Sequence, residues 1–110
     1  MAGRVGVGVA TDQDLGSRVP RGVDEPRDDL DRAVAMANRL DVGLGASVWS
    51  SDRDAARAVA ARLEAGTVWI NSHGGVHPMI PFGGVKKSGY GLEFGVEGLK
   101  AVAVPQVING

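Results

Sequence analysis

The sequence predicts an α/β fold, a short parallel sheet with flanking helices, and three features carry this prediction. Two segments with helical spacing of apolar residues, 28–40 and 51–65, each precede a short run of β-branched and aromatic residues. This helix–strand–helix–strand order is typical of a parallel sheet flanked by helices, with right-handed connections. A stretch rich in Gly and Pro, 71–95, follows the second strand, and α/β proteins usually place their sites at such a position.

The first 27 residues differ from the rest, and we expect them to be irregular apart from one weak strand. Val5–Ala10 alternates small apolar residues with glycine, which is compatible with a strand. Gly6 and Gly8 lack the third glycine and the following helix pattern of a dinucleotide-binding loop, so we assign no phosphate site here. Residues 11–27 are polar and charged with several Gly and Pro, which predicts an irregular or disordered stretch.

The first helix is predicted over 28–40. Asp28 is the expected N-cap, and an acidic residue at Asp31 suits the positive end of the helix dipole. One apolar stripe follows helical spacing, formed by Leu30, Ala33, Val34, Ala37 and Leu40. A turn then leads to a strand over 46–49, in which we expect Trp49 to lie in the core because of its large ring.

The second helix is the clearest local element. We expect Ser51 to cap it, with Asp54 completing the Ser-x-x-Asp pattern, and Gly66 to end it in the left-handed position. Its apolar stripe is formed by Ala55, Val59 and Leu63, helped by Ala56 and Ala60.

A buried strand is predicted over 67–70, and it ends at Asn71, where the loop begins. A short third helix is predicted over 93–100. Residues 101–108 alternate loosely, which predicts an edge strand whose pairing is limited by Pro105.

Composition excludes several classes of function. A chain of 110 residues forms one domain at most, and its net charge of −1 gives no electrostatic argument for binding nucleic acid or an anionic membrane. Its apolar runs are far shorter than the roughly 20 residues that span a bilayer, and its start lacks the apolar core of a signal peptide. It contains no cysteine, hence no disulfide and no thiolate zinc site, which fits a cytoplasmic location.

Two further patterns have some likeness to known sites. His73 and His77 are four residues apart, which is a metal-ligand spacing on a helix, but the glycines and proline around them predict a loop, so we expect no metal. The run Gly83–Ser88 has some likeness to a phosphate-binding loop, yet a Walker motif needs glycine directly before its Lys-Ser pair, where this chain has Lys86.

The longest motif is Pro-Phe-Gly-Gly-x-Lys-x-Ser-Gly-x-Gly-x-Glu-x-Gly, at Pro81–Gly95. It resembles the C-terminal signature of the NAD(P)-dependent aldehyde dehydrogenase superfamily, and three upstream blocks, 63–71, 43–49 and 28–33, are similar to that family as well. The resemblance implies a partial catalytic domain: residues 28–110 form its C-terminal part, and residues 1–27 are non-homologous. A Glu-x-Phe-Gly-Pro segment, expected in the family before this point, is missing.

The same resemblance implies a substrate-binding loop. The segment 71–82 would line the mouth of the aldehyde tunnel, with Phe82 in its wall and Val76, Met79 and Ile80 as further contacts. An apolar wall of this kind would bind the carbon chain and keep water from the reacting carbon. The alternative is that Phe82 anchors the turn in the core, and the two roles are compatible.

Activity is expected to be absent from these residues alone. The family oxidises an aldehyde through a thiohemiacetal on a cysteine and passes hydride to NAD or NADP, whereas this chain has no cysteine and is too short for a coenzyme domain. We therefore expect no catalytic, cofactor-binding or metal-binding residue, and a truncated dehydrogenase that is inert alone. The alternatives are a non-catalytic module that docks on dehydrogenase subunits, and a gene remnant. Self-association or pairing with such subunits is the expected partnership, through residues 101–108.

Overall fold

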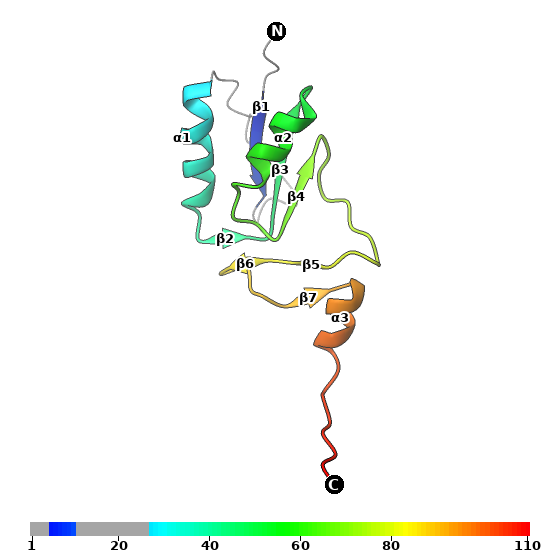
Figure 1. The fold of residues 1–110 in the computed structure, drawn as a ribbon. Coiled ribbons are helices and arrows are strands. Elements are labelled where there is room, and N and C mark those ends of the chain that lie inside the picture. Colours follow the sequence, from blue (N-terminus) through cyan, green and yellow to red (C-terminus); the bar gives the residue numbers. More distant parts are fainter. Residues whose placement is uncertain (1–4, 11–26) are drawn as a thin grey trace.

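The computed structural model describes residues 5–10 and 27–110, and the body of this part is a three-stranded sheet with two helices (Figure 1). The strands are β1 (Val5–Ala10), β3 (Gly45–Ser50) and β4 (Thr67–Ile70), in the order β1-β3-β4. β3 and β4 are parallel, as predicted, whereas β1 pairs with β3 in the antiparallel sense and forms one edge. The α/β class is confirmed, and so is the weak N-terminal strand; the prediction for residues 11–26 lies outside the described residues.

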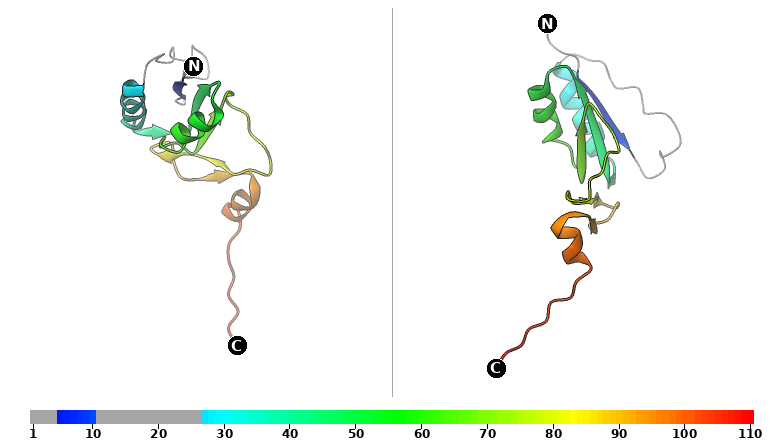
Figure 2. Two further views of the ribbon diagram at one scale, coloured as in Figure 1. Left: turned by 45° about the horizontal axis from the view of Figure 1, so that its top comes forward. Right: turned by 90° about the vertical axis from the view of Figure 1, so that its right-hand side faces the viewer.

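The helices α1 (Arg27–Asn38) and α2 (Arg53–Ala60) pack against one face of the sheet, and the right-hand view of Figure 2 shows α2 beside it. The buried core contains one residue from α1, Val34. It also contains Ala56 and Val59 from α2, Ala46 and Val48 from β3, and Leu63, which follows α2. The predicted stripe of α2 therefore faces the sheet, and so do Leu30, Val34 and Ala37 of the first stripe. Leu40 was predicted to belong to it, but α1 ends at Asn38 and Leu40 is 39% exposed. No helix in the described part of the chain is long and apolar enough to cross a membrane.

The helix ends differ from the prediction. α1 begins at Arg27, one residue before the predicted cap at Asp28. α2 is capped by Asp52 and not by Ser51, because the Asp52 carboxylate accepts hydrogen bonds from the N–H groups of Asp54 and Ala55, both at 3.0 Å. A carboxylate suits the N-cap position as well as a hydroxyl does. In a Ser-Asp pair, the path of the surrounding chain therefore decides which of the two residues caps the helix.

Gly66 does not end α2. The helix stops at Ala60 with a right-handed cap at Ala61, and Gly66 lies further on, where the backbone comes very close to that of Gly83. The glycine is required for this close approach and not for a left-handed turn.

Trp49 was predicted to lie in the core and is instead 47% exposed. Successive strand residues point to opposite faces. Because Ala46 and Val48 face the helices, Trp49 lies on the other face, which no helix of the described residues covers.

A second layer of short elements lies below the sheet in Figure 1. It contains β2 (Val42–Gly43), β5 (Phe82–Gly83), β6 (Val85–Lys86), β7 (Leu92–Glu93) and α3 (Gly95–Ala101). β2 pairs with β6 and β5 pairs with β7, both antiparallel. The predicted third helix is confirmed, although it starts two residues later than expected.

The predicted edge strand over 101–108 is wrong for this structure. After α3 the chain has no regular structure and extends away from the body, and Val102, Val104, Val107 and Ile108 are almost fully exposed (Figures 1 and 2). An edge strand needs a neighbouring strand to pair with, and none of the described strands lies beside this tail.

Candidate functional site

The candidate site is the loop over residues 71–81, which leaves the carboxyl end of β4 and returns to the body at Phe82 in β5. Asn71 starts it with a left-handed φ of 55°, a conformation that asparagine tolerates better than most residues. Its side chain accepts from the Ser50 N–H and donates to the Ser50 carbonyl, both at 2.8 Å, while its own N–H donates to the Val48 carbonyl at 2.9 Å. The Asn71 amide therefore continues the β3–β4 pairing while the main chain turns away.

Trp69 and Ser47 anchor the first half of the loop on the sheet face opposite the helices. The two residues are register partners on β4 and β3. Trp69 Nε1 donates to the Gly75 carbonyl at 2.7 Å, and the Trp69 ring meets the His73 ring edge-on, with centroids 4.9 Å apart. His73 Nδ1 also shares a hydrogen bond of 2.5 Å with the hydroxyl of the buried Ser47. The loop is thus fixed over the indole.

The tip of the loop is a hydrogen-bonded turn that is tied to α3. His77 accepts from the Met79 N–H through Nδ1 at 3.1 Å, and from the Ile80 N–H through its carbonyl at 3.0 Å. The Gly95 N–H, at the start of α3, donates to the Pro78 carbonyl at 2.9 Å. Both loop histidines therefore have structural roles, and the described residues contain no group of three or more His, Cys, Asp or Glu that could hold a metal ion.

The structure divides the four predicted substrate-binding residues into two sets. Phe82 is half-buried and packs against Trp69, with ring centroids 6.3 Å apart at a tilt of 37°. Val76, Met79 and Ile80 lie on the outer side of the loop and are 54%, 74% and 62% exposed. Phe82 is therefore placed as an anchor that still presents part of its ring, and the other three provide an apolar outer surface.

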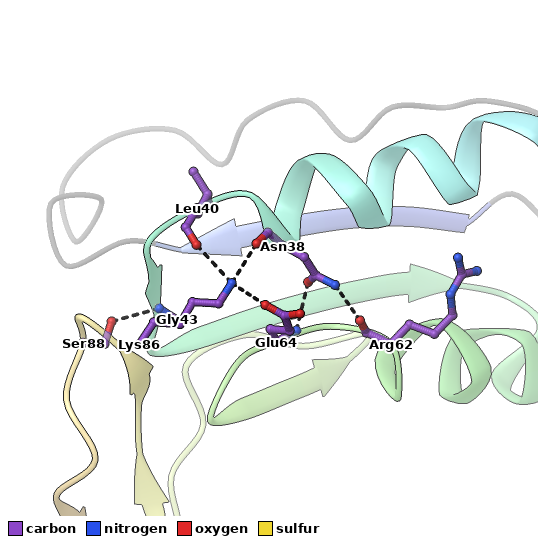
Figure 3. A network of polar contacts seen from close by, with 7 residues as sticks. All are labelled: Asn38, Leu40, Gly43, Arg62, Glu64, Lys86 and Ser88. Atoms are coloured by element: carbon purple, nitrogen blue, oxygen red, sulfur yellow. Dashed lines mark hydrogen bonds and ion pairs between the residues drawn. The ribbon is translucent and has the colours of Figure 1, made fainter.

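A polar cluster that sequence reasoning missed holds the signature segment to the body (Figure 3). Lys86 donates through Nζ to the carbonyls of Asn38 and Leu40 at 2.8 and 3.0 Å, and forms an ion pair with Glu64 at 2.6 Å. The Asn38 side chain donates to the Arg62 carbonyl at 2.8 Å and accepts from the Glu64 N–H at 2.9 Å. We call Lys86, Asn38, Leu40 and Glu64 the Lys86 clasp. It caps the carboxyl end of α1, where a cation is favourable.

Neighbouring signature residues strengthen the same connection. The Gly43 N–H donates to the Ser88 hydroxyl at 3.0 Å (Figure 3), and the Lys87 N–H donates to the Asp41 carbonyl at 2.9 Å. The Lys87 ammonium, 2.6 Å from the Asp41 carboxylate, lowers the pKa of that carboxyl below its ordinary value, chiefly through their hydrogen bond. Lys86, Lys87 and Ser88 therefore hold the signature segment to the chain between α1 and β3 and to Glu64.

Comparisons with known proteins agree with this architecture. Residues 25–108 match the sequence profile of the Aldehyde dehydrogenase family. The putative aldehyde dehydrogenase FUS7 of Gibberella fujikuroi is 57% identical over 70 residues, which cover 64% of this chain and 15% of that protein.

Two solved structures are similar in fold and sequence. Betaine aldehyde dehydrogenase from Staphylococcus aureus, in complex with NAD+, has a TM-score of 0.66 and 38% identity over 73% of this chain and 18% of its own. Succinic semialdehyde dehydrogenase from Streptococcus pyogenes, in complex with NADP+, has a TM-score of 0.64 and 37% identity over 70% of this chain and 18% of its own.

The chain therefore spans less than one fifth of the length of these relatives. With more than three quarters of its residues inside the family match, this chain belongs to the aldehyde dehydrogenase family.

Proposed function

We propose that these residues serve as the C-terminal part of an aldehyde dehydrogenase catalytic domain, in which the loop 71–82 forms part of the wall of the aldehyde channel. The observation that carries the proposal is the anchored loop itself. Trp69 and Ser47 hold its base, the turn at His77 holds its tip, and Val76, Met79 and Ile80 are left facing outward with nothing in the described chain to bury them fully. Exposed apolar side chains on a fixed backbone suit a wall that is completed by other parts of a dehydrogenase.

In this role the chain contributes binding and exclusion of water to the parent reaction, the NAD(P)-dependent oxidation of an aldehyde to a carboxylic acid. A nucleophilic thiolate is needed to form the covalent intermediate of that reaction, and the chain has no cysteine. We therefore assign it no catalytic residue and no NAD or NADP of its own. We further propose a cytoplasmic location and a boundary near residue 27, where the resemblance to the family begins.

We expect the purified 110-residue chain to show no dehydrogenase activity. The measurement is the appearance of NADH or NADPH with short and long aldehydes, each with NAD+ and with NADP+, beside a full-length homologue as positive control. Because no thiolate is present to form the thiohemiacetal, the rate should equal that of buffer. Turnover above that background, proportional to protein concentration, would contradict the proposal.

A second candidate function is that of a non-catalytic module that pairs with dehydrogenase subunits or with itself. The observation that favours it is the extended tail after α3, where Val102, Val104, Val107 and Ile108 are almost fully exposed. An unpaired apolar segment of this kind can add to a sheet edge of another chain. Light scattering and size exclusion, with and without a full-length homologue, test this candidate: we expect oligomers or a stoichiometric complex, and a clean monomer in both samples would exclude it.

A further inference from the structure

The loop offers no lysine or arginine to an anionic ligand. Residues 71–83 contain no Asp, Glu, Lys or Arg, and the exposed apolar side chains among them are those of Val76, Met79 and Ile80. The Nδ1 atoms of both loop histidines are engaged within the chain, His73 with the Ser47 hydroxyl and His77 with the Met79 N–H.

The charges of the adjoining segment are either compensated or of the wrong sign for an anionic ligand. Lys86 and Lys87 are both paired with carboxylates at 2.6 Å, and they lie at the β6 end of the layer, away from the loop (Figure 1). The nearest charged register partner of the wall is Glu93, which pairs with Phe82 across β5 and β7. A carboxylate at this position repels another carboxylate.

From this charge pattern we infer that the wall selects an uncharged aldehyde with a hydrocarbon tail over an aldehyde that carries a carboxylate. The inference rests on the proposed function, since it names the substrate class of the same loop. The physical basis is desolvation: a hydrocarbon tail gains from leaving water against Val76, Met79 and Ile80. A carboxylate loses its hydration there, and residues 71–83 offer it no Lys or Arg.

The methionine methyl groups allow a direct test on the full 110-residue chain. Met79 lies on the wall, while Met36 is also exposed but lies on α1, so its methyl group is an internal control. With the methionine methyls labelled with 13C, the chain is titrated with two unreactive ligands of equal tail length, hexanamide and hexanoate. We expect the Met79 signal to shift with hexanamide and the Met36 signal to stay in place. Hexanoate should need at least about tenfold higher concentrations for the same shift of Met79.

A variant that adds a cation to the wall tests the same inference from the opposite direction. Ile80 is exposed, so Ile80→Lys should keep the fold while placing a cation on the wall, and Leu99→Lys adds the same charge to the exposed side of α3 as a matched control. We expect Ile80→Lys, and not Leu99→Lys, to increase the response of Met79 to hexanoate about fivefold or more. Equal responses of Met79 to both ligands, or no gain in Ile80→Lys, would overturn the neutral substrate class. No response of Met79 to any ligand would instead overturn the role of the loop as a wall.

Discussion

Gly66→Ala should destabilise the chain by about 3 kcal/mol or more, at the upper end of what overpacking produces. A Cβ atom at this position would lie 1.7 Å from the Gly83 oxygen, 2.7 Å from the Gly83 carbonyl carbon and 3.0 Å from the Gly84 Cα. All three are backbone atoms, so no side-chain rotation can relieve the contact. Because the Gly66 N–H also donates to the Gly43 carbonyl at 3.0 Å, the main chain is held from the other side. The new methyl group would therefore separate the signature segment from the sheet.

The measurement is urea unfolding followed by circular dichroism and by tryptophan fluorescence. Gly91→Ala is the matched control, since a Cβ atom there would meet nothing within 4 Å and its φ lies outside the left-handed region. We expect the control to change the free energy of unfolding by no more than about 1 kcal/mol, in either direction. Overlapping unfolding curves for the two variants would mean that the approach of Gly66 to Gly83 is not as close as the structure shows.

The elements that could be predicted from the sequence are those with strong local signals. α2 and β4 were found because the 3.6-residue apolar period and a β-branched run are properties of a few adjacent residues. The parallel pairing of β3 with β4 followed from the helix between them. The cap of α2 was misplaced by one residue because Ser51 and Asp52 are both good caps, and only the path of the chain decides between them.

The errors concern properties that depend on distant parts of the chain. Trp49 was expected in the core because of its size, but whether a sheet face is covered depends on which elements pack there, and both helices pack on the other face. The tail after α3 has the alternation of a strand, yet a strand exists only with a partner. Neither property can be read from a short window of sequence.

The candidate site was predictable as a segment but not as a set of contacts. The resemblance gave the loop and Phe82. The half-buried place of Phe82 against Trp69 agrees with the role of an anchor, and its role in the wall of the aldehyde channel stays a prediction. The Lys86 clasp was missed because its partners Asn38 and Leu40 are 48 and 46 residues away, and a lysine in a glycine-rich loop has no pattern that names its acceptors. Backbone carbonyls at a helix end attract a cation from any element that reaches them.

Lys86→Met should lower the free energy of unfolding by about 2 kcal/mol, the range expected for hydrogen bonds that involve a charged group. Methionine keeps much of the lysine stem and also has a Cβ atom, so the strain of the left-handed backbone at φ 56° is the same in both proteins. The substitution removes only the ammonium group, and this leaves the carbonyls of Asn38 and Leu40 and the Glu64 carboxylate without their partner. The Lys86 side chain is only 23% exposed and its bond to the Asn38 carbonyl is partly buried, so water replaces that contact poorly.

Lys87→Met is the matched control, because it removes the same group from the adjacent residue, where the pair with Asp41 is largely exposed. We expect little change in stability, since exposed ion pairs contribute little. The Asp41 carboxyl should nevertheless report the lost contact, because its pKa is lowered chiefly by the Lys87 hydrogen bond and should rise toward its ordinary value when followed by NMR. Added salt gives a further distinction: it screens the exposed pair but not the hydrogen bonds of Lys86 to carbonyls, so the gap between the two variants should persist at high ionic strength. If both variants unfolded at the same urea concentration, the signature segment would have to be held by its glycine contacts and strand pairing alone.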